Sequence, residues 1–189
     1  MEVIAASNRK INSVAVLGSG IMGSRLACHF ANIGLKVFLL DIVPFDLTEE
    51  EKGNPKARNR IVNTALKTAL KSNPSPVYSK DVAKNITTGN FDDNMDWLSK
   101  VDWTIEAVIE NLKIKKEVFE KVEKHRRPGT LISSNTSGIP ISMMLDGRSE
   151  EFQAHFCGTH FFNPPRYLRL LEIIPTVKTD AEVTKFLMR

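Results

Sequence analysis

The sequence has few of the features that mark secreted or membrane proteins. It contains two cysteines, Cys28 and Cys157, which are too few and too far apart to form a disulfide framework. No apolar run approaches the roughly 20 residues of a membrane-spanning helix. Residues 1–12 are expected to be a short lead-in without the apolar core of a signal peptide. We therefore expect a cytoplasmic protein with no membrane partner and with both cysteines as buried free thiols.

A strong excess of one charge is also absent. The net charge of +4 suits an anionic ligand but does not by itself indicate nucleic acid, and we expect neither a nucleic-acid partner nor a metal site. The chain has 189 residues, of which 42% are hydrophobic. This length and composition predict about one globular domain with a sizeable core.

One stretch organises the chain, VAVLGSGIMGSRLACHFANIGLKVFLLD at residues 14–41. Its first four residues form an apolar run that indicates a buried strand. Three glycines follow in the spacing G-x-G-x-x-G. A helical pattern then leads to a second strand, at whose end Asp41 lies. The alternative is a glycine-rich turn in some other βαβ protein.

Each glycine of this motif has a separate predicted task. Gly18 allows the tight turn, Gly20 lets a pyrophosphate approach the backbone, and Gly23 allows close packing of the helix on the strand. The start of the helix offers unpaired N–H groups and the positive end of its dipole to phosphates. The Asp41 carboxylate is placed to accept hydrogen bonds from an adenosine ribose. The predicted nucleotide site consists of Gly18, Gly20, Ile21, Met22, Gly23 and Asp41.

Strand and helix signals alternate along the rest of the chain. Strands are expected at 86–88, 103–108 and 131–132, and helices at 54–72, at 92–99 and from Asn111 onward. This alternation predicts an α/β fold with a doubly wound, mostly parallel sheet and a helical segment inserted after the second strand. The helix at 54–72 is basic outside its apolar face. That surface is either simply solvated or a docking site for a phosphate-rich part of a substrate.

A second informative stretch is FCGTHFFNPPRYLRLLEIIP at residues 156–175. His160 lies in one apolar run, and Glu172 is the single acid of the next, at 168–174. We expect Glu172 to be buried, where a carboxylate needs a partner. If the two runs are neighbours, Glu172 can hydrogen-bond one ring nitrogen of His160 and leave the other to act as a general base. The alternative is a satisfied core histidine.

Four segments together resemble the NAD-binding domain of the 3-hydroxyacyl-CoA dehydrogenases of fatty-acid β-oxidation. They are VLGSGIMG, IEAVIENLKIKKEVF, SSNTSGIPI and GTHFFNPPRYLRLLEIIP. The resemblance covers nearly the whole chain and looks closest to bacterial proteins in which this dehydrogenase precedes an enoyl-CoA hydratase unit. It implies a Rossmann-type domain over residues 1–189, NAD as cofactor, and oxidation of (S)-3-hydroxyacyl-CoA to 3-oxoacyl-CoA.

The resemblance also assigns roles to residues. His160 matches the catalytic base, Glu172 its partner, and Ser137 the serine that contacts the substrate hydroxyl and the cofactor. The other residues that it adds to the NAD site are Glu110, Lys115 and Asn163. The helical insertion matches the segment that contacts coenzyme A. Arg25 stands where many members have a small residue, and it either meets a phosphate or lies on the surface.

The resemblance implies a second, all-helical domain after the NAD-binding domain, and we expect that the 189 residues do not include it. We therefore expect the chain alone to bind NAD but to turn over little or no substrate. Its last helix, begun by a capping box of Thr179 and Glu182, is expected to expose Val183, Phe186 and Leu187 and so to allow self-association. Two other functions stay open: a dehydrogenase of a free hydroxy acid on the same fold, and a non-catalytic NAD-binding module.

Overall fold

The structure is a computed structural model that describes residues 9–189, so most of the predicted lead-in lies outside the described residues. The strands are β1 (Ser13–Leu17), β2 (Lys36–Asp41), β3 (Ile86–Asn90), β4 (Trp103–Glu106), β5 (Leu131–Ser134), β6 (Phe156–Phe161) and β7 (Leu171–Pro175). The α-helices are α1 (Ile21–Asn32), α2 (Pro55–Arg58), α3 (Arg60–Leu70), α4 (Leu112–His125), α5 (Glu150–Ala154) and α6 (Ala181–Leu187). The 3₁₀ helices are η1 (Glu51–Gly53), η2 (Lys80–Asn85), η3 (Met95–Lys100) and η4 (Ile141–Leu145).

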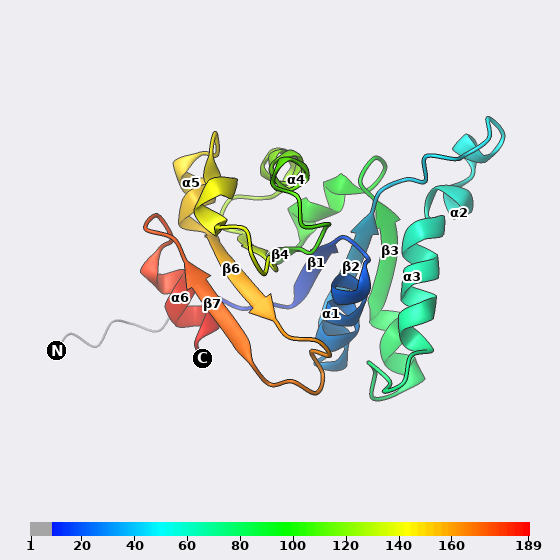
Figure 1. Cartoon of the computed structure of the whole chain (residues 1–189), viewed down its shortest axis with the longest axis horizontal. Coiled ribbons are helices and arrows are strands. Elements are labelled where there is room, and N and C mark those ends of the chain that lie inside the picture. The colour runs from blue at the N-terminus through cyan, green and yellow to red at the C-terminus, as the bar shows by residue number, and fades with distance from the viewer. Residues whose placement is uncertain (1–8) are drawn as a thin grey trace.

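The strands form one sheet in the order β3-β2-β1-β4-β5-β6-β7 (Figure 1). The first six are parallel, and β7 runs antiparallel to β6 at the edge. The chain leaves β1 toward one side of the sheet and later returns to build the other side from β4. This is the strand order of Rossmann-type dinucleotide-binding folds, so the predicted fold class is confirmed.

Two apolar cores lie on opposite faces of the sheet, which explains why its central strands are continuous apolar runs. In β1, Val14 and Val16 face a core that includes residues of α1, α3 and α6. Ala15 and Leu17 face a second core, to which α4, α5, η3 and η4 contribute. Cys28 and Cys157 are buried and free, as predicted, and burial raises their pKa to about 11 and about 12 respectively.

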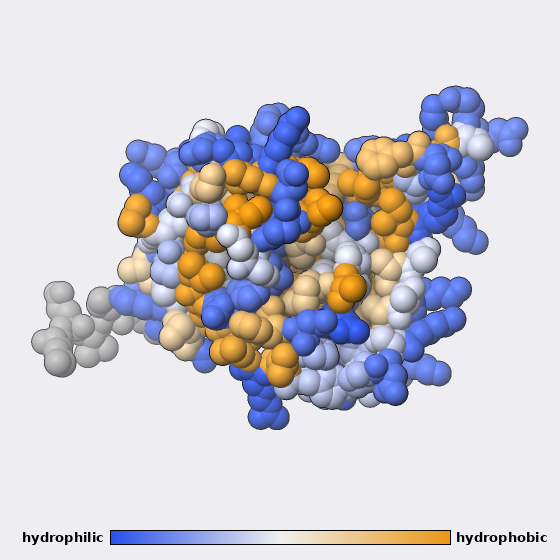
Figure 2. Space-filling model, in the orientation of Figure 1, coloured by the Kyte–Doolittle hydropathy of each residue, from blue (hydrophilic) through white to orange (hydrophobic). Residues whose placement is uncertain are grey.

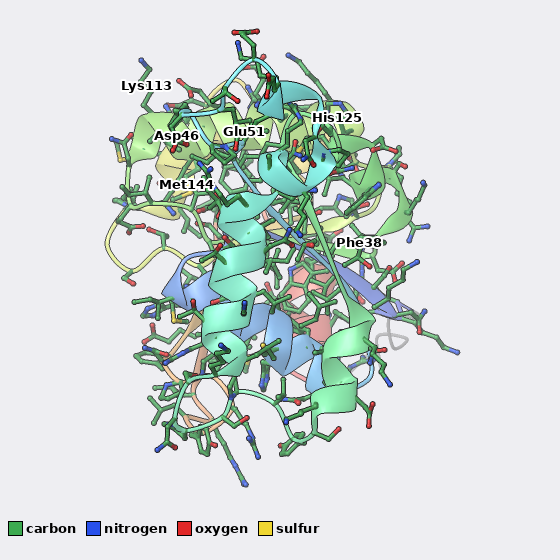
Figure 3. The ribbon with its side chains drawn as sticks, turned by 90° about the vertical axis from the view of Figure 1, so that its right-hand side faces the viewer. Phe38, Asp46, Glu51, Lys113, His125 and Met144 are labelled. Atoms are coloured by element: carbon green, nitrogen blue, oxygen red, sulfur yellow. The ribbon has the colours of Figure 1, made fainter. Side chains whose placement is uncertain are left out.

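The inserted segment consists of two helices where one was predicted. Its start is as expected, because Asn54 caps α2 by accepting from the Lys56 N–H and Pro55 is the first helical residue. The helix then breaks at Asn59, whose side chain accepts a hydrogen bond of 2.8 Å from Asn90 at the end of β3. This contact ties the insertion to the sheet. Figure 3 shows α3 running along the outside of the molecule.

Two other predictions about local structure are corrected. The short helix expected at 92–99 is the 3₁₀ helix η3. The last helix, α6, is capped by Asp180, because the Thr179 hydroxyl donates instead to the Phe156 carbonyl oxygen. The prediction that α6 exposes an apolar face is also wrong. Val183 is buried, and Phe186 and Leu187 pack against the same core.

Within residues 9–189, no helix has the length and apolar character to cross a membrane.

The turn between β1 and α1 has no room for a side chain at two of its three glycines. Gly18 has a φ of 99°, and a Cβ there would lie 2.6 Å from the Ala107 carbonyl oxygen. A Cβ at Gly23 would lie 1.8 Å from the Gly18 carbonyl oxygen. At Gly20 a Cβ would meet nothing within 4 Å. Gly18 and Gly23 therefore shape the turn, whereas Gly20 leaves open space beside it.

We expect Gly23→Ala to lower the free energy of unfolding by about 1–3 kcal/mol, because its Cβ must push α1 away from the Gly18 carbonyl. Gly20→Ala serves as the matched control. It introduces the same methyl group into open space, so we expect a loss of about 1 kcal/mol or less, from weaker capping of α1. Urea unfolding of both variants checks the prediction, and equal losses would contradict the close-packing role of Gly23.

Candidate active site

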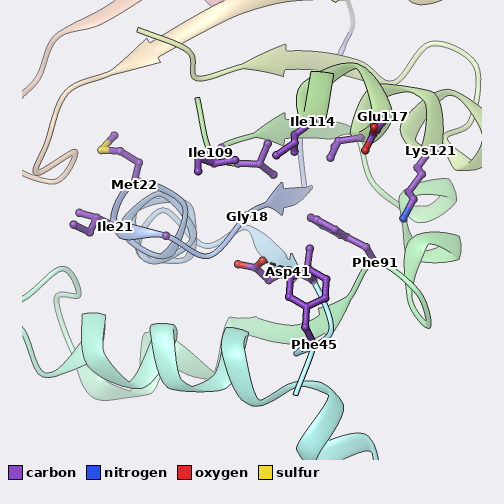
Figure 4. Close-up of a pocket in the computed structure, with 15 residues that line it drawn as sticks. Gly18, Ile21, Met22, Asp41, Phe45, Phe91, Ile109, Ile114, Glu117 and Lys121 are labelled. Carbon is purple, nitrogen blue, oxygen red and sulfur yellow. Dashed lines mark hydrogen bonds between the residues drawn. The ribbon is translucent and has the colours of Figure 1, made fainter. Parts of the chain in front are cut away.

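A cleft of about 690 Å³ opens at the carboxyl end of the sheet, beside the ends of β1 and β4 (Figure 4). Gly18 and Gly20 line it from the loop after β1, and Ala107 and Val108 line it from the loop after β4. The strand order reverses between these two strands. Open α/β sheets bind ligands at such a point, because the loops that leave it diverge to opposite faces of the sheet.

The start of α1 and Asp41 supply the polar groups of this cleft. No side chain caps α1 at Gly20, so its first N–H groups lack partners within the helix and are directed toward the cleft. The Oδ2 atom of Asp41 accepts hydrogen bonds from the Ser19 N–H (2.6 Å) and hydroxyl (2.5 Å). Its Oδ1 atom accepts from the Ile42 N–H at 2.7 Å. These bonds fix the carboxylate and leave lone pairs for a further donor.

Apolar side chains line the other part of the cleft, near Asp41. The rings of Phe45 and Phe91 project into it from the loops after β2 and β3, and Ile114 and Val118 contribute from α4 (Figure 4). The Phe45 side chain is 93% exposed, so its ring is available to cover a flat apolar group. Sequence reasoning missed both phenylalanines. The only signal for Phe45 was a lone aromatic residue in an acidic, turn-rich loop.

Three side chains from separate segments meet beyond this cleft. The antiparallel pairing of β6 and β7 places His160 directly opposite Glu172. The Nδ1 atom of His160 lies 2.8 Å from Glu172 Oε2, and its Nε2 atom lies 3.1 Å from Ser137 Oγ. Because a carboxylate only accepts hydrogen bonds, we assign the ring proton to Nδ1. The Nε2 atom then accepts from the Ser137 hydroxyl and is the basic nitrogen.

The expected burial of Glu172 is wrong. Its side chain is 52% exposed, whereas that of His160 is 18% exposed. The reason is that β7 is an edge strand, and its apolar residues are partly exposed as well. Strand register, and not the need to neutralise a buried charge, therefore brings this carboxylate to His160.

Arg25 has a partner that the sequence did not indicate. Its Nη1 atom donates a hydrogen bond of 2.5 Å to the side-chain oxygen of Asn163. This contact joins the first turns of α1 to the loop between β6 and β7. Neither residue lines the cleft. The phosphate contact considered for Arg25 and the place of Asn163 in the NAD site therefore remain predictions.

Lys115 lies behind the site and reaches it through Glu110. Its Nζ atom is 3.2 Å from Glu110 Oε2 and 2.7 Å from Oε1 of Glu106, an acid at the end of β4. The side chains of Lys115 and Glu106 are 1% and 0% exposed. Burial raises the pKa of Glu106, and the charge of Lys115 opposes that shift. Sequence reasoning missed Glu106, although an acid that closes an apolar strand was a visible signal.

Glu110 holds the loop that carries Ser137. Its Oε1 atom accepts hydrogen bonds from the N–H groups of Ser137 and Gly138, both at 3.1 Å, and from the Thr136 hydroxyl. Burial acts to raise the pKa of Glu110. The hydrogen bonds from Thr136, Gly138 and Lys115 outweigh it and lower the pKa to about 2. Glu110 is therefore a loop-holding carboxylate in this structure.

The basic side of the insertion remains exposed. Lys56 precedes the break between α2 and α3, and Lys67 and Lys71 lie beyond it on the outer side. Arg60, at the start of α3, pairs with Asp46 at 2.5 Å. Both interpretations of this surface, a solvated face and a docking site, therefore stay open.

Within residues 9–189, no group of three or more His, Cys, Asp or Glu side chains is placed to hold a metal ion.

The pKa of Glu110 predicts a pH-dependent contribution to stability. Since its pKa in the folded protein, about 2, is below its ordinary value of 4.5, the ionised group stabilises the fold above pH ~5. This contribution is lost as the pH falls from about 5 to 2. We expect the difference in unfolding free energy between the unmodified chain and Glu110→Gln to shrink over that range. Urea unfolding at several pH values measures it, and a constant difference would contradict the assignment.

Comparison with known proteins identifies the family. The family model for the NAD-binding domain of 3-hydroxyacyl-CoA dehydrogenases matches residues 13–189. A Bacillus subtilis protein named "Probable 3-hydroxyacyl-CoA dehydrogenase" is 50% identical over 186 residues, which cover 95% of this chain and 24% of that protein. A Deinococcus radiodurans protein of the same name is 47% identical over 176 residues, which cover 93% of this chain and 49% of that protein.

A solved structure has a similar fold. The crystal structure of 3-hydroxybutyryl-CoA dehydrogenase from Escherichia coli is 28% identical with a TM-score of 0.69, and the match covers 94% of this chain and 35% of that one. The chain spans about a quarter to a half of the length of the curated relatives described above. The resemblance seen in the sequence is confirmed: the chain belongs to the 3-hydroxyacyl-CoA dehydrogenase family, of which it forms the NAD-binding domain.

Proposed function

We propose that this domain serves the oxidation of (S)-3-hydroxyacyl-CoA to 3-oxoacyl-CoA in fatty-acid β-oxidation, with NAD⁺ as cofactor. The observation that carries the proposal is the arrangement around His160. One ring nitrogen is held by Glu172, and the other is unprotonated, accepts a hydrogen bond from the Ser137 hydroxyl and can take a proton from a substrate hydroxyl that replaces it. A non-catalytic nucleotide-binding module has no need of such a pair.

The cleft fits a dinucleotide. The open space beside Gly20 and the first N–H groups of α1 suit a pyrophosphate. The carboxylate of Asp41 suits the ribose hydroxyls, and the ring of Phe45 suits the adenine. When bound, NAD⁺ supplies the acceptor for the hydride that leaves C3 of the substrate.

Residues of this chain carry out the proton transfer of the reaction. The Nε2 atom of His160 takes the proton of the 3-hydroxyl group, while the Ser137 hydroxyl holds the same oxygen in place. The Glu172 carboxylate keeps the other proton on Nδ1 and stabilises the imidazolium ion that forms. Proton transfer to a positioned base contributes typically ~10²–10⁴-fold to the rate.

The coenzyme A part of the substrate is assigned to the basic side of the insertion. Lys56, Lys67 and Lys71 are exposed there and suit its phosphates. The acyl chain needs apolar surface, and Figure 2 shows apolar side chains gathered over β7 and the loop before it, where Leu170 is 56% and Ile174 38% exposed. The relatives are longer than this chain, and a further domain of theirs would close this side.

A cytoplasmic location fits the two buried free thiols.

The proposed activity is tested by NADH formation from a 3-hydroxyacyl-CoA, with this chain and with a longer form that continues into the family's helical domain. We expect turnover from the longer form and little from the chain alone, because one wall cannot hold C3 in place. In the active form, His160→Gln should lower kcat by about 10²–10⁴-fold and leave the affinity for NAD⁺ nearly unchanged.

His125→Gln is the control for this experiment, because His125 lies at the far end of α4 and its ring nitrogen contacts the backbone carbonyl of Lys121 in its own helix. Near-normal turnover by His160→Gln would show that the base is misassigned. Turnover of a free 3-hydroxy acid as fast as of its CoA thioester would favour the alternative dehydrogenase. Equal rates from the short and long forms would show that one domain suffices.

Asp41 predicts a preference for NAD over NADP, since its carboxylate repels a 2′-phosphate. We expect NAD to bind at least tenfold more tightly, which corresponds to about 1.4 kcal/mol. Asp41→Ala should narrow that difference. Ser19→Ala is the control, because it removes one loop hydrogen bond and keeps the carboxylate. Calorimetric titration with both cofactors measures the ratio, and equal or tighter binding of NADP would contradict the role of Asp41.

A further inference from the structure

We propose that Glu106 is a positioning residue for this site: with Lys115 it fixes Glu110, and Glu110 holds the loop that presents Ser137 to His160. The kinetic part of this inference rests on the proposed function. The structural part does not, because it concerns the order of a loop in the chain itself.

The pair at the base of this network is completely enclosed. Lys115 Nζ lies 2.7 Å from Glu106 Oε1, and that oxygen also accepts the Val108 N–H at 2.7 Å. The other oxygen of Glu106 accepts the Ser134 hydroxyl at 2.5 Å. Glu106 therefore grips the last residue of β5, which leads directly into the loop that carries Ser137.

The backbone of Glu106 grips the next residue as well. Its carbonyl oxygen accepts the Asn135 N–H at 2.8 Å. The Asn135 side chain in turn accepts the Phe161 N–H at 2.9 Å, at the end of the strand that carries His160. The beginning of the loop is thus held to both β4 and β6.

Glu110 holds the middle of the same loop. Its carboxylate accepts the N–H groups of Ser137 and Gly138, and its second oxygen contacts Lys115 at 3.2 Å. One buried ammonium group therefore joins two carboxylates, one that holds the end of β5 and one that holds the middle of the loop after it. The 44% exposed Glu110 side chain has no other cation within ion-pair distance in the described part of the chain.

A purely structural ion pair is the alternative explanation, and burial argues against it. Removing two charges from water is costly, and well-packed apolar residues often stabilise such a site equally well. What apolar residues cannot supply is a fixed positive charge for Glu110. Such a charge keeps that carboxylate ionised and aimed at two backbone N–H groups.

The first experiment uses Glu106→Gln, which keeps the size of the side chain and removes its charge. Amide hydrogen exchange is measured at Ser137 and Gly138 in this chain. We expect exchange at both positions to quicken by about tenfold or more, because Lys115 loses its anchoring carboxylate and no longer holds Glu110 in one position. In the active longer form, we expect kcat to fall about tenfold or more while the Kd for NAD⁺ stays within about twofold.

Glu151→Gln is the matched control. It breaks the ion pair with Arg126, whose side chain is 4% exposed, at the opposite end of α4 from Lys115. We expect it to lower stability without changing exchange at Ser137 and Gly138 or kcat. Unchanged exchange and kcat in Glu106→Gln would overturn the proposal.

The double variant Glu106→Gln with Lys115→Met separates positioning from stability. It leaves no unpaired buried charge, so stability should recover relative to Glu106→Gln alone. Protection of Ser137 and Gly138, and kcat, should stay low because Glu110 has no cation to hold it in this double variant. If stability, amide protection and kcat all recovered, the Glu106–Lys115 pair would be merely structural and the proposal would be overturned. If the unmodified longer form shows no turnover, the proposed function fails, and the exchange measurements still decide the positioning role.

Discussion

The close contact between α1 and the end of β1 is the constraint on which the nucleotide side of the molecule depends. No side-chain atom fits between Gly23 and the Gly18 carbonyl, so the helix approaches the strand more closely than any other residue would permit. This approach directs the first N–H groups of α1 into the space where the strand order reverses. Asp41 then locks the turn through Ser19. The glycines thus determine where the cleft lies as well as leaving it open.

The opposite side of the site is held by charge. Glu106, Lys115 and Glu110 form a continuous chain of contacts from the core to the Ser137 loop. Buried charges tolerate little displacement, since each lost contact leaves a desolvated group without a partner. The glycine-rich side of the domain therefore depends on the absence of side chains, whereas the side that carries Ser137 depends on a network of charged side chains.

Elements with strong local signals were predictable from the sequence, and elements set by tertiary contacts were not. The first strand was predicted within one residue, because a buried parallel strand is apolar on both faces. The helix and the second strand that follow it were predicted in the right order. The break at Asn59 was not, since it depends on Asn90, which is distant in the sequence. The exposure of Glu172 depends on β7 being an uncovered edge strand. Glu106 was missed because its partner comes from the following helix, and an isolated acid in an apolar strand does not reveal that partner.

The antiparallel pairing of β6 and β7 separates the alignment of His160 with Glu172 from the composition of the connection between these strands. His160 and Glu172 meet because they are opposite each other in β6 and β7, and residues 162–170 merely connect these strands. The alignment is set by the ladder between the two strands, and side chains of the connection beyond Asn163 take no part in that ladder. That connection borders the surface proposed for the acyl chain. Substitutions can therefore change that surface while His160 and Glu172 keep their position opposite each other.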